Sequence, residues 1–259
     1  MSRDSREDVP LRNIALTLSY DGTGFLGWQR QTGKAKTGRT VQEAVETALG
    51  RMHGHAVPLI GSGRTDSGVH AVGQVANFFT DIASIPAERF VPALNSMLPQ
   101  DVRVVGSREA DPLFHARFSA RSRTYRFFLH CGARPFAHEL PYVWHIGRWP
   151  SLPRVNAMAA YLSGEIDCTT FAAAGDQSAS KSRYLFGAHF HPEGDRVVFE
   201  ISANAFLWRM VRSVVGTIVH LDGIGADPSE FARVLRAKDR SLAGPTAPGN
   251  GLFLWNVRY

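Results

Sequence analysis

Hydrophobic and polar residues alternate along the segment that follows residue 12. The hydrophobic positions there are Ile14, Leu16, Leu18 and Tyr20. Because residues two positions apart share one face of an extended chain, this pattern predicts a half-buried β-strand over residues 13–20. From Thr40 the spacing changes to three and four positions, through Val41, Ala44, Val45, Ala48, Leu49 and Met52. That spacing predicts an amphipathic helix, and Thr40 followed by Glu43 is typical of a capping box at its start.

The remaining apolar runs complete a repeated order of elements. In the first half, runs at 56–60, 72–80 and 102–109 predict strands, and Pro86 begins a predicted helix over 86–97. In the second half, the predicted strands are 123–130, 184–191, 196–203 and 252–259, and the predicted helices are 153–162, 206–221 and a further one that Asp227 caps. Apart from that further helix, each half has the order β-α-β-β-α-β.

This repeat predicts an α+β protein of two tandem ferredoxin-like sandwiches. We expect each sandwich to carry its helices on one face of an antiparallel sheet, and the two sheets to join around a central basic cleft. Asp111-Pro112 interrupts the pattern. The predicted domains are therefore residues 13–110 and 111–259, after a disordered tail at 1–12, with a flexible basic loop at 33–39.

Composition and charge point to a nucleic-acid partner. The chain has 259 residues, 44% of them hydrophobic, which is enough for a sizeable core. Lys and Arg total 29 against 23 Asp and Glu, a net charge of +6 that favours a polyanion. A concave platform of two open sheets would suit RNA.

The cysteine positions and the hydropathy pattern indicate where in the cell the protein is expected. Cys131 and Cys168 are far apart and lack Cys-x-x-Cys spacing, which argues against a disulfide framework or a zinc site. Residues 1–12 are charged and polar, and no run approaches eighteen apolar residues. We therefore expect a cytoplasmic protein with no signal peptide and no membrane span.

The segment 61–71, GSGRTDSGVHA, is the first candidate for chemistry. It lies between two predicted strands and places one carboxylate, Asp66, two residues after Arg64. Its three glycines allow positive φ and close approach to another molecule. The alternative is an ordinary turn, since Asp and Ser beside Gly form turns readily.

Two further segments carry arginines in unusual settings. Residues 114–127, FHARFSARSRTYRF, interleave arginine with aromatic residues, which suits phosphates and stacked bases. The alternative is a strand with an aromatic core and solvated arginines. In the predicted helix 206–221, Arg209 and Arg212 lie three apart, opposite an apolar face that begins at Leu207. An arginine on an apolar helix requires an anion, either a phosphate or a carboxylate such as Asp66.

These segments together resemble the tRNA pseudouridine synthase A family. The matching motifs are 20–23 (YDGT), 27–31 (GWQRQ), 63–71 (GRTDSGVHA), 114–118 (FHARF) with Tyr125, 210–212 (MVR) followed by Gly216, and the tail motifs 247–248 (AP), 251–252 (GL) and 257–259 (VRY). They occur in the family's order over residues 13–259. Phe127 and Cys168 depart from the residues common at those positions, Tyr and Phe, and replace no residue of the implied catalytic set.

The resemblance implies a cofactor-free, metal-free homodimer that isomerises uridine to pseudouridine at positions 38, 39 and 40 of the tRNA anticodon arm. It implies that Asp66 is the nucleophile and that Tyr125 lies against the target base. Arg64 and Arg212 would bind the RNA backbone or pair with Asp66, and we favour Arg212 for that pairing. The other implied substrate-binding residues are Leu207, Arg30, His70 and Arg117.

The chemistry of the reaction requires similar residue types. Isomerisation detaches uracil from C1′ and rejoins it through C5, so it needs neither a redox centre nor a metal. A carboxylate can attack either the sugar carbon or uracil C6. A non-catalytic RNA-binding protein would use the same basic surface without needing Asp66. A glycosidase-like hydrolase would need a second carboxylate, and segments 61–71 and 114–127 contain only Asp66.

Overall fold

The computed structural model describes residues 11–31 and 38–259, which form two compact units of an α+β fold. Unit 1 contains the described residues up to Ser67 together with Ala71–Ala120. Unit 2 contains Gly68–His70 and Arg121–Tyr259. The predicted tail up to residue 10 and residues 32–37 of the predicted basic loop lie outside the described residues.

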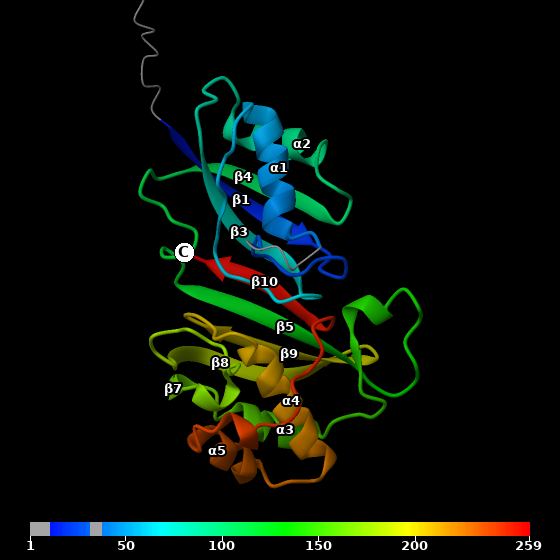
Figure 1. Cartoon of the computed structure of the whole chain (residues 1–259). Coiled ribbons are helices and arrows are strands. Elements are labelled where there is room, and N and C mark those ends of the chain that lie inside the picture. Colours follow the sequence, from blue (N-terminus) through cyan, green and yellow to red (C-terminus); the bar gives the residue numbers. More distant parts are fainter. Residues whose placement is uncertain (1–10, 32–37) are drawn as a thin grey trace, which may run out of the picture. The chain divides into compact units, whose positions relative to one another are not determined.

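Unit 1 is a small antiparallel sheet with two helices (Figure 1). Its strands are β1 (Arg12–Tyr20), β2 (Ile60–Gly61), β3 (His70–Thr80) and β4 (Val102–Ala110), in the order β4-β1-β3 with β2 paired to β3. The helices α1 (Val41–His53) and α2 (Phe90–Asn95) lie beside each other. All four predicted apolar side chains of β1 are buried, so the strand prediction for this segment is confirmed.

Unit 2 has a longer sheet and three helices. The sheet order is β10-β5-β9-β8-β7, with the strands β5 (Ser122–His130), β7 (Gly164–Asp167), β8 (Ser182–Glu193), β9 (Arg196–Ala203) and β10 (Leu252–Arg258). The helices α3 (Leu152–Ala159), α4 (Met210–Gly223) and α5 (Pro228–Arg236) group together (Figure 1). The short strand β6 (Trp144–His145) pairs with β5 in parallel, so the expectation of purely antiparallel sheets is wrong here.

Helix starts follow their predicted caps where a side chain is available. Thr40 accepts a hydrogen bond from the N–H of Glu43 at the start of α1, and Asp227 accepts one from Ser229 at the start of α5. The prediction of a disordered tail is wrong at its last residue. Arg12 begins β1, and its guanidinium forms a 2.8 Å ion pair with Glu109.

The strand predicted at 56–60 is wrong, because β2 consists only of Ile60–Gly61. The N–H of Leu59 donates to Glu46 Oε1, and its carbonyl accepts from Gln42 Nε2, each at 3.1 Å. Side chains of α1 therefore satisfy a backbone that would otherwise need a strand partner. Val57 and Leu59 are nevertheless buried, which explains the apolar run.

Two predicted helices are shorter than expected. The segment 86–97 divides into a 3₁₀ turn, η1 (Ala87–Arg89), and α2, because Pro92 has no N–H with which to continue an α-helical ladder from Glu88. The helix predicted from residue 206 begins only at Met210, because Arg209 has a left-handed backbone with φ 61°. Among the described residues, no helix is long and apolar enough to cross a membrane.

Candidate functional site

The loop that carries Asp66 is fixed on both sides of the carboxylate. Thr65 accepts a 3.1 Å hydrogen bond from the N–H of Trp28 through its carbonyl, and its hydroxyl is 2.8 Å from the hydroxyl of Tyr20. On the other side, Ser67 Oγ donates to the carbonyl of Phe25 at 3.1 Å. Because its neighbours are anchored to buried residues, the half-buried Asp66 is held in one backbone position.

Gly27 allows the motif around Trp28 to reach this loop. Its backbone has φ 101°, and a Cβ at this position would be 2.5 Å from the carbonyl oxygen of Thr65. Any side chain here would therefore push the loop away. The GWQRQ motif and the GRTDSGVHA motif are thus one structure, in which the first supports the second.

Arg64 is exposed and belongs to a network of amides. Its Nε donates to Gln29 Oε1 at 3.1 Å, and Gln29 Nε2 donates to Gln42 Oε1 at 2.6 Å. Gln42 Nε2 continues the chain to Glu46 Oε1 at 2.9 Å. Among the described residues, the partner of the Arg64 side chain is therefore a neutral amide rather than a carboxylate.

In unit 2, Tyr125 lies on β5 and is only 8% exposed. Its ring meets the ring of Phe206 edge to face, with centroids 5.0 Å apart. Phe127, two positions along the strand, is fully buried in the core. Leu207, which precedes α4, is also buried.

Arg212 on α4 is tied to the segment that precedes β10. Its Nε donates to the carbonyl of Ala247 at 2.8 Å, and the N–H of Ala247 donates to the carbonyl of Arg212 at 3.0 Å. Gly216 makes this approach possible, because a Cβ there would be 1.8 Å from the carbonyl oxygen of Pro245. The MVR motif, Gly216 and the Ala-Pro tail motif therefore form one structural element.

Arg209 does not share a helix face with Arg212, so that prediction is wrong. Arg209 is the residue before α4, and its left-handed backbone places it outside the helical repeat. Its guanidinium lies 4.9 Å from the ring centroid of Trp208.

A family model described as tRNA pseudouridine synthase matches residues 17–119 and 158–259. The chain belongs to this tRNA pseudouridine synthase family. It is 59% identical to tRNA pseudouridine synthase A of Treponema denticola over 249 residues, which cover 96% of this chain and 93% of that protein. It is 43% identical to the Bacillus subtilis protein of the same name, over 95% of this chain and 98% of that protein. The resemblance noted from the motifs is confirmed.

The other predicted substrate-binding residues of this pseudouridine synthase have varied surroundings. His70 is 1% exposed, stacks on Phe253 with centroids 4.5 Å apart, and has Nε2 3.0 Å from the carbonyl oxygen of Pro141. Arg30 is exposed and lies 3.3 Å from Glu46. Arg117 is exposed on the segment after β4, with its guanidinium 5.5 Å from the ring centroid of Phe118. Substrate contact by these three residues stays a prediction.

Sequence reasoning missed the supporting residues of this family member. Gln42 and Glu46 lie one turn apart on α1 and hold both Gln29 and Arg30. Their four-residue spacing on the polar face of a predicted helix was the available signal. Within residues 11–31 and 38–259, the structure contains no group of three or more His, Cys, Asp or Glu side chains that could hold a metal ion.

Proposed function

We propose that Asp66 is the nucleophile with which this tRNA pseudouridine synthase isomerises uridine in the anticodon arm, at positions 38, 39 and 40. The observation that carries the proposal is the anchoring of Thr65 and Ser67 to Tyr20, Phe25 and Trp28. A nucleophile must meet its target in one geometry, and a loop fixed on both sides supplies that condition before substrate binds. A turn that only connects two strands does not need this anchoring.

The reaction places limited demands on the protein. The N1–C1′ bond breaks, the uracil turns and a C5–C1′ bond forms. C5 then loses its proton to solvent, and N1 takes up one proton in exchange. The isomerisation is balanced without an oxidant or a reductant. Asp66 supplies the covalent step, at C1′ or at uracil C6, and an ion pair with an arginine favours its ionised form.

We assign the remaining roles on the same basis. Tyr125 and Leu207 bind the target base, and Arg212 pairs with Asp66. Arg64, Arg30, His70 and Arg117 contact the RNA. Removing the base from the stack costs about a few kcal/mol, and stacking on a tyrosine returns about 1–3 kcal/mol.

The proposal also includes the fold type of the two units, the oligomeric state and the cellular location. We propose that both units are ferredoxin-like, with their sheets joined around a basic cleft. The sheet of unit 1 has its first strand between the fourth and the third, and unit 2 repeats that order in β10-β5-β9-β8.

We further propose a cytoplasmic homodimer whose substrate is the anticodon arm of tRNA. Light scattering on the purified protein tests the dimer, and a mass of one chain refutes it.

The test of the nucleophile uses Asp66→Asn with unmodified tRNA transcripts and pseudouridine mapping at single-base resolution. We expect the parent protein to modify positions 38–40 and the variant to form no pseudouridine, with tRNA affinity kept within about tenfold because phosphate contacts dominate binding. Asp195→Asn is the control, since its side chain is 62% exposed in the turn between β8 and β9. Substantial turnover by pure Asp66→Asn contradicts the proposal.

A further inference from the structure

A pocket of about 580 Å³ lies beside the N-terminus of α4 in unit 2. Its polar lining consists of Arg209, Ser213, Arg240, Ser241 and Thr246. Two of these side chains carry a positive charge, and none of the described residues that line the pocket is acidic. The lining therefore favours an anion.

The residue before α4 does not cap the helix with its side chain. Among the described residues, Arg209 at this position makes no side-chain cap hydrogen bond, and the first turn of α4 contains no acidic residue. Thr40 and Asp227 cap the starts of α1 and α5, whereas α3, like α4, has no side-chain cap bond. An uncapped helix start presents N–H groups and a partial positive charge, which bind anions.

Ser213 supplies an independent sign of a missing ligand. The residue is 1% exposed, and its Oγ has no hydrogen-bond partner among the described residues, although it lines the pocket. Buried hydroxyl groups are normally paired. An acceptor or donor bound in the pocket would give this hydroxyl its partner.

The two arginines are positioned by contacts that leave their charge available. Arg240 Nη2 donates to Thr246 Oγ1 at 2.8 Å, and the Arg209 guanidinium lies over Trp208. Across the part of the chain that the structure describes, neither arginine forms an ion pair with a carboxylate. A tetrahedral oxyanion can accept from several such donors at once.

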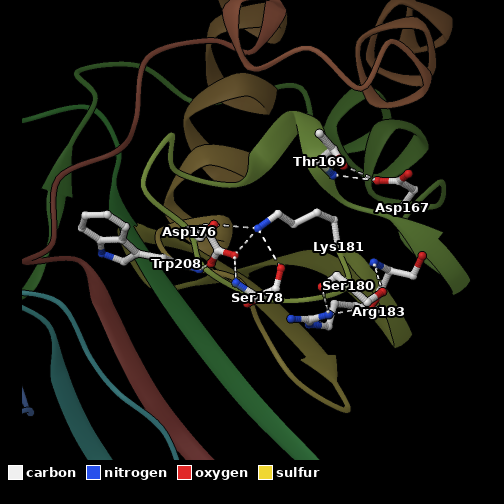
Figure 2. A network of polar contacts seen from close by, with 9 residues as sticks. Asp167, Thr169, Asp176, Ser178, Ser180, Lys181, Arg183 and Trp208 are labelled. Carbon is white, nitrogen blue, oxygen red and sulfur yellow. Dashed lines mark hydrogen bonds and ion pairs between the residues drawn. The ribbon is translucent and has the colours of Figure 1, made fainter.

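A partly buried polar network holds the backbone of Trp208, the residue before Arg209. The N–H of Trp208 donates to Asp176 Oδ2 at 2.7 Å, and Lys181 Nζ lies 2.5 Å from the other oxygen of Asp176 (Figure 2). The next residue, Arg209, has a left-handed backbone with φ 61° and lies directly before α4. The carboxylate of this network is already neutralised by Lys181, so it does not oppose an anion in the pocket.

We propose that this pocket binds a phosphate group of the tRNA backbone, through Arg209, Arg240, the Ser213 hydroxyl and the N-terminus of α4. The assignment of tRNA as the source of the phosphate rests on the function proposed above. The pocket is a binding site and takes no part in the covalent step.

The first test measures the affinity for an unmodified tRNA transcript at several salt concentrations. Arg209→Gln should reduce the slope of log affinity against log salt by about one, the effect of losing one phosphate contact. Arg236→Gln is the matched control, because Arg236 is exposed at the end of α5 and does not line the pocket. A slope for Arg209→Gln equal to that of the parent overturns the proposal.

The second test compares two serines whose Oγ atoms are buried. Ser213→Ala should weaken tRNA binding by about tenfold, the loss of a hydrogen bond to a charged group. Ser107→Ala should leave it unchanged, because Ser107 Oγ is also buried without a described partner but lies on β4, outside the pocket. Equal affinities for the two variants overturn the proposal.

A third measurement separates RNA from a free phosphorylated compound. In this measurement, inorganic phosphate is added, and the thermal unfolding midpoints of the parent and of Ser213→Ala are compared. If phosphate raises only the midpoint of the parent, and Arg209→Gln also leaves the salt slope of tRNA binding unchanged, the pocket binds a small ligand and the assignment to RNA is wrong. Failure of the proposed function is a separate result. A parent protein that forms no pseudouridine refutes the function, whereas the salt slopes address this pocket alone.

Discussion

Arg212 and Ala247 exchange two hydrogen bonds, one through the Arg212 Nε and one through the backbone, at 2.8 and 3.0 Å. The side-chain bond orients the guanidinium plane and uses one of its five N–H donors. The other donors belong to the two terminal amino groups, which have the fork geometry that matches a carboxylate.

This arrangement supports a test of the pairing proposed between Arg212 and Asp66. Arg212→Met should lower turnover far more than tRNA affinity, because the Asp66 carboxylate would lose the cation proposed to orient it while the phosphate contacts remain. Arg212→Lys keeps the charge without the planar fork and should be intermediate. Both variants lose the bond from Nε to Ala247, so the difference between them reports the charge.

The competing assignment sends Arg212 to a phosphate. In that case Arg212→Met weakens tRNA binding and flattens its salt dependence, while turnover at saturating tRNA changes little. Measuring turnover at saturating tRNA and binding against salt for the same variant decides between the two roles.

Gly216→Ala should destabilise unit 2. The added Cβ would lie 1.8 Å from the Pro245 carbonyl oxygen, so α4 and the segment before Ala247 must separate. We expect a loss of about 1–3 kcal/mol in the free energy of unfolding, measured by urea denaturation. Gly50→Ala is the control on another helix, where the nearest atom would be 3.4 Å away. That variant should gain up to about 1 kcal/mol from helix propensity, and equal losses in both variants would contradict the argument.

Asp176→Asn should lower stability at neutral pH and change its dependence on acid. Burial raises the pKa of Asp176, but hydrogen bonds from Lys181, Trp208 and Ser178 lower it more, so the pKa falls below its ordinary value of 3.8. A lowered folded-state pKa stabilises the protein above about pH 4, and this contribution is lost as the pH falls through the folded value.

The expected loss for Asp176→Asn at pH 7 is about 1–3 kcal/mol, because the partly exposed Lys181 loses its carboxylate partner and keeps only its bonds to the carbonyls of Asp176 and Ser178. Below about pH 4 the variant should lose stability less steeply than the parent. Urea denaturation at several pH values measures both effects. Parallel curves for parent and variant would show that the carboxylate contributes no pH-dependent stability.

The two thiols should be chemically silent in the folded protein. Burial raises the pKa of Cys168 to about 12 and raises that of Cys131 as well. Since the thiolate is the reactive form, iodoacetamide at neutral pH should label neither residue in the native state and both in urea. Mass spectrometry of the alkylated protein measures this, and stoichiometric labelling of Cys168 in the native state would contradict it.

The fold was predictable where local pattern and tertiary environment agree. Alternation over β1 and the capped apolar repeat of α1 depend on nearest neighbours, and both predictions are confirmed. The prediction at 56–60 fails because Gln42 and Glu46, distant in sequence, bind the backbone of Leu59. Burial alone cannot distinguish that segment from a strand.

The candidate site was predictable in its residue types and less so in its supports. The position of Asp66 in a glycine-rich loop is visible in the sequence, whereas the anchoring of Thr65 by Tyr20 and Trp28 requires the fold. The left-handed backbone of Arg209 has no local signature, since arginine rarely adopts it. An apolar repeat that begins at residue 206 therefore predicts a helix start several residues too early.

The two hydrogen bonds between Arg212 and Ala247 also indicate where residues can be inserted into the chain. Arg212 and Ala247 are 35 residues apart in sequence. The segment between them, which contains α5, therefore begins and ends at the same part of α4. Residues 223–225, within that segment, are exposed. Extra residues inserted there lengthen a loop whose ends are already joined, at a small cost in loop-closure entropy, and β10 keeps its register. This position therefore suits the attachment of a tag or fluorophore.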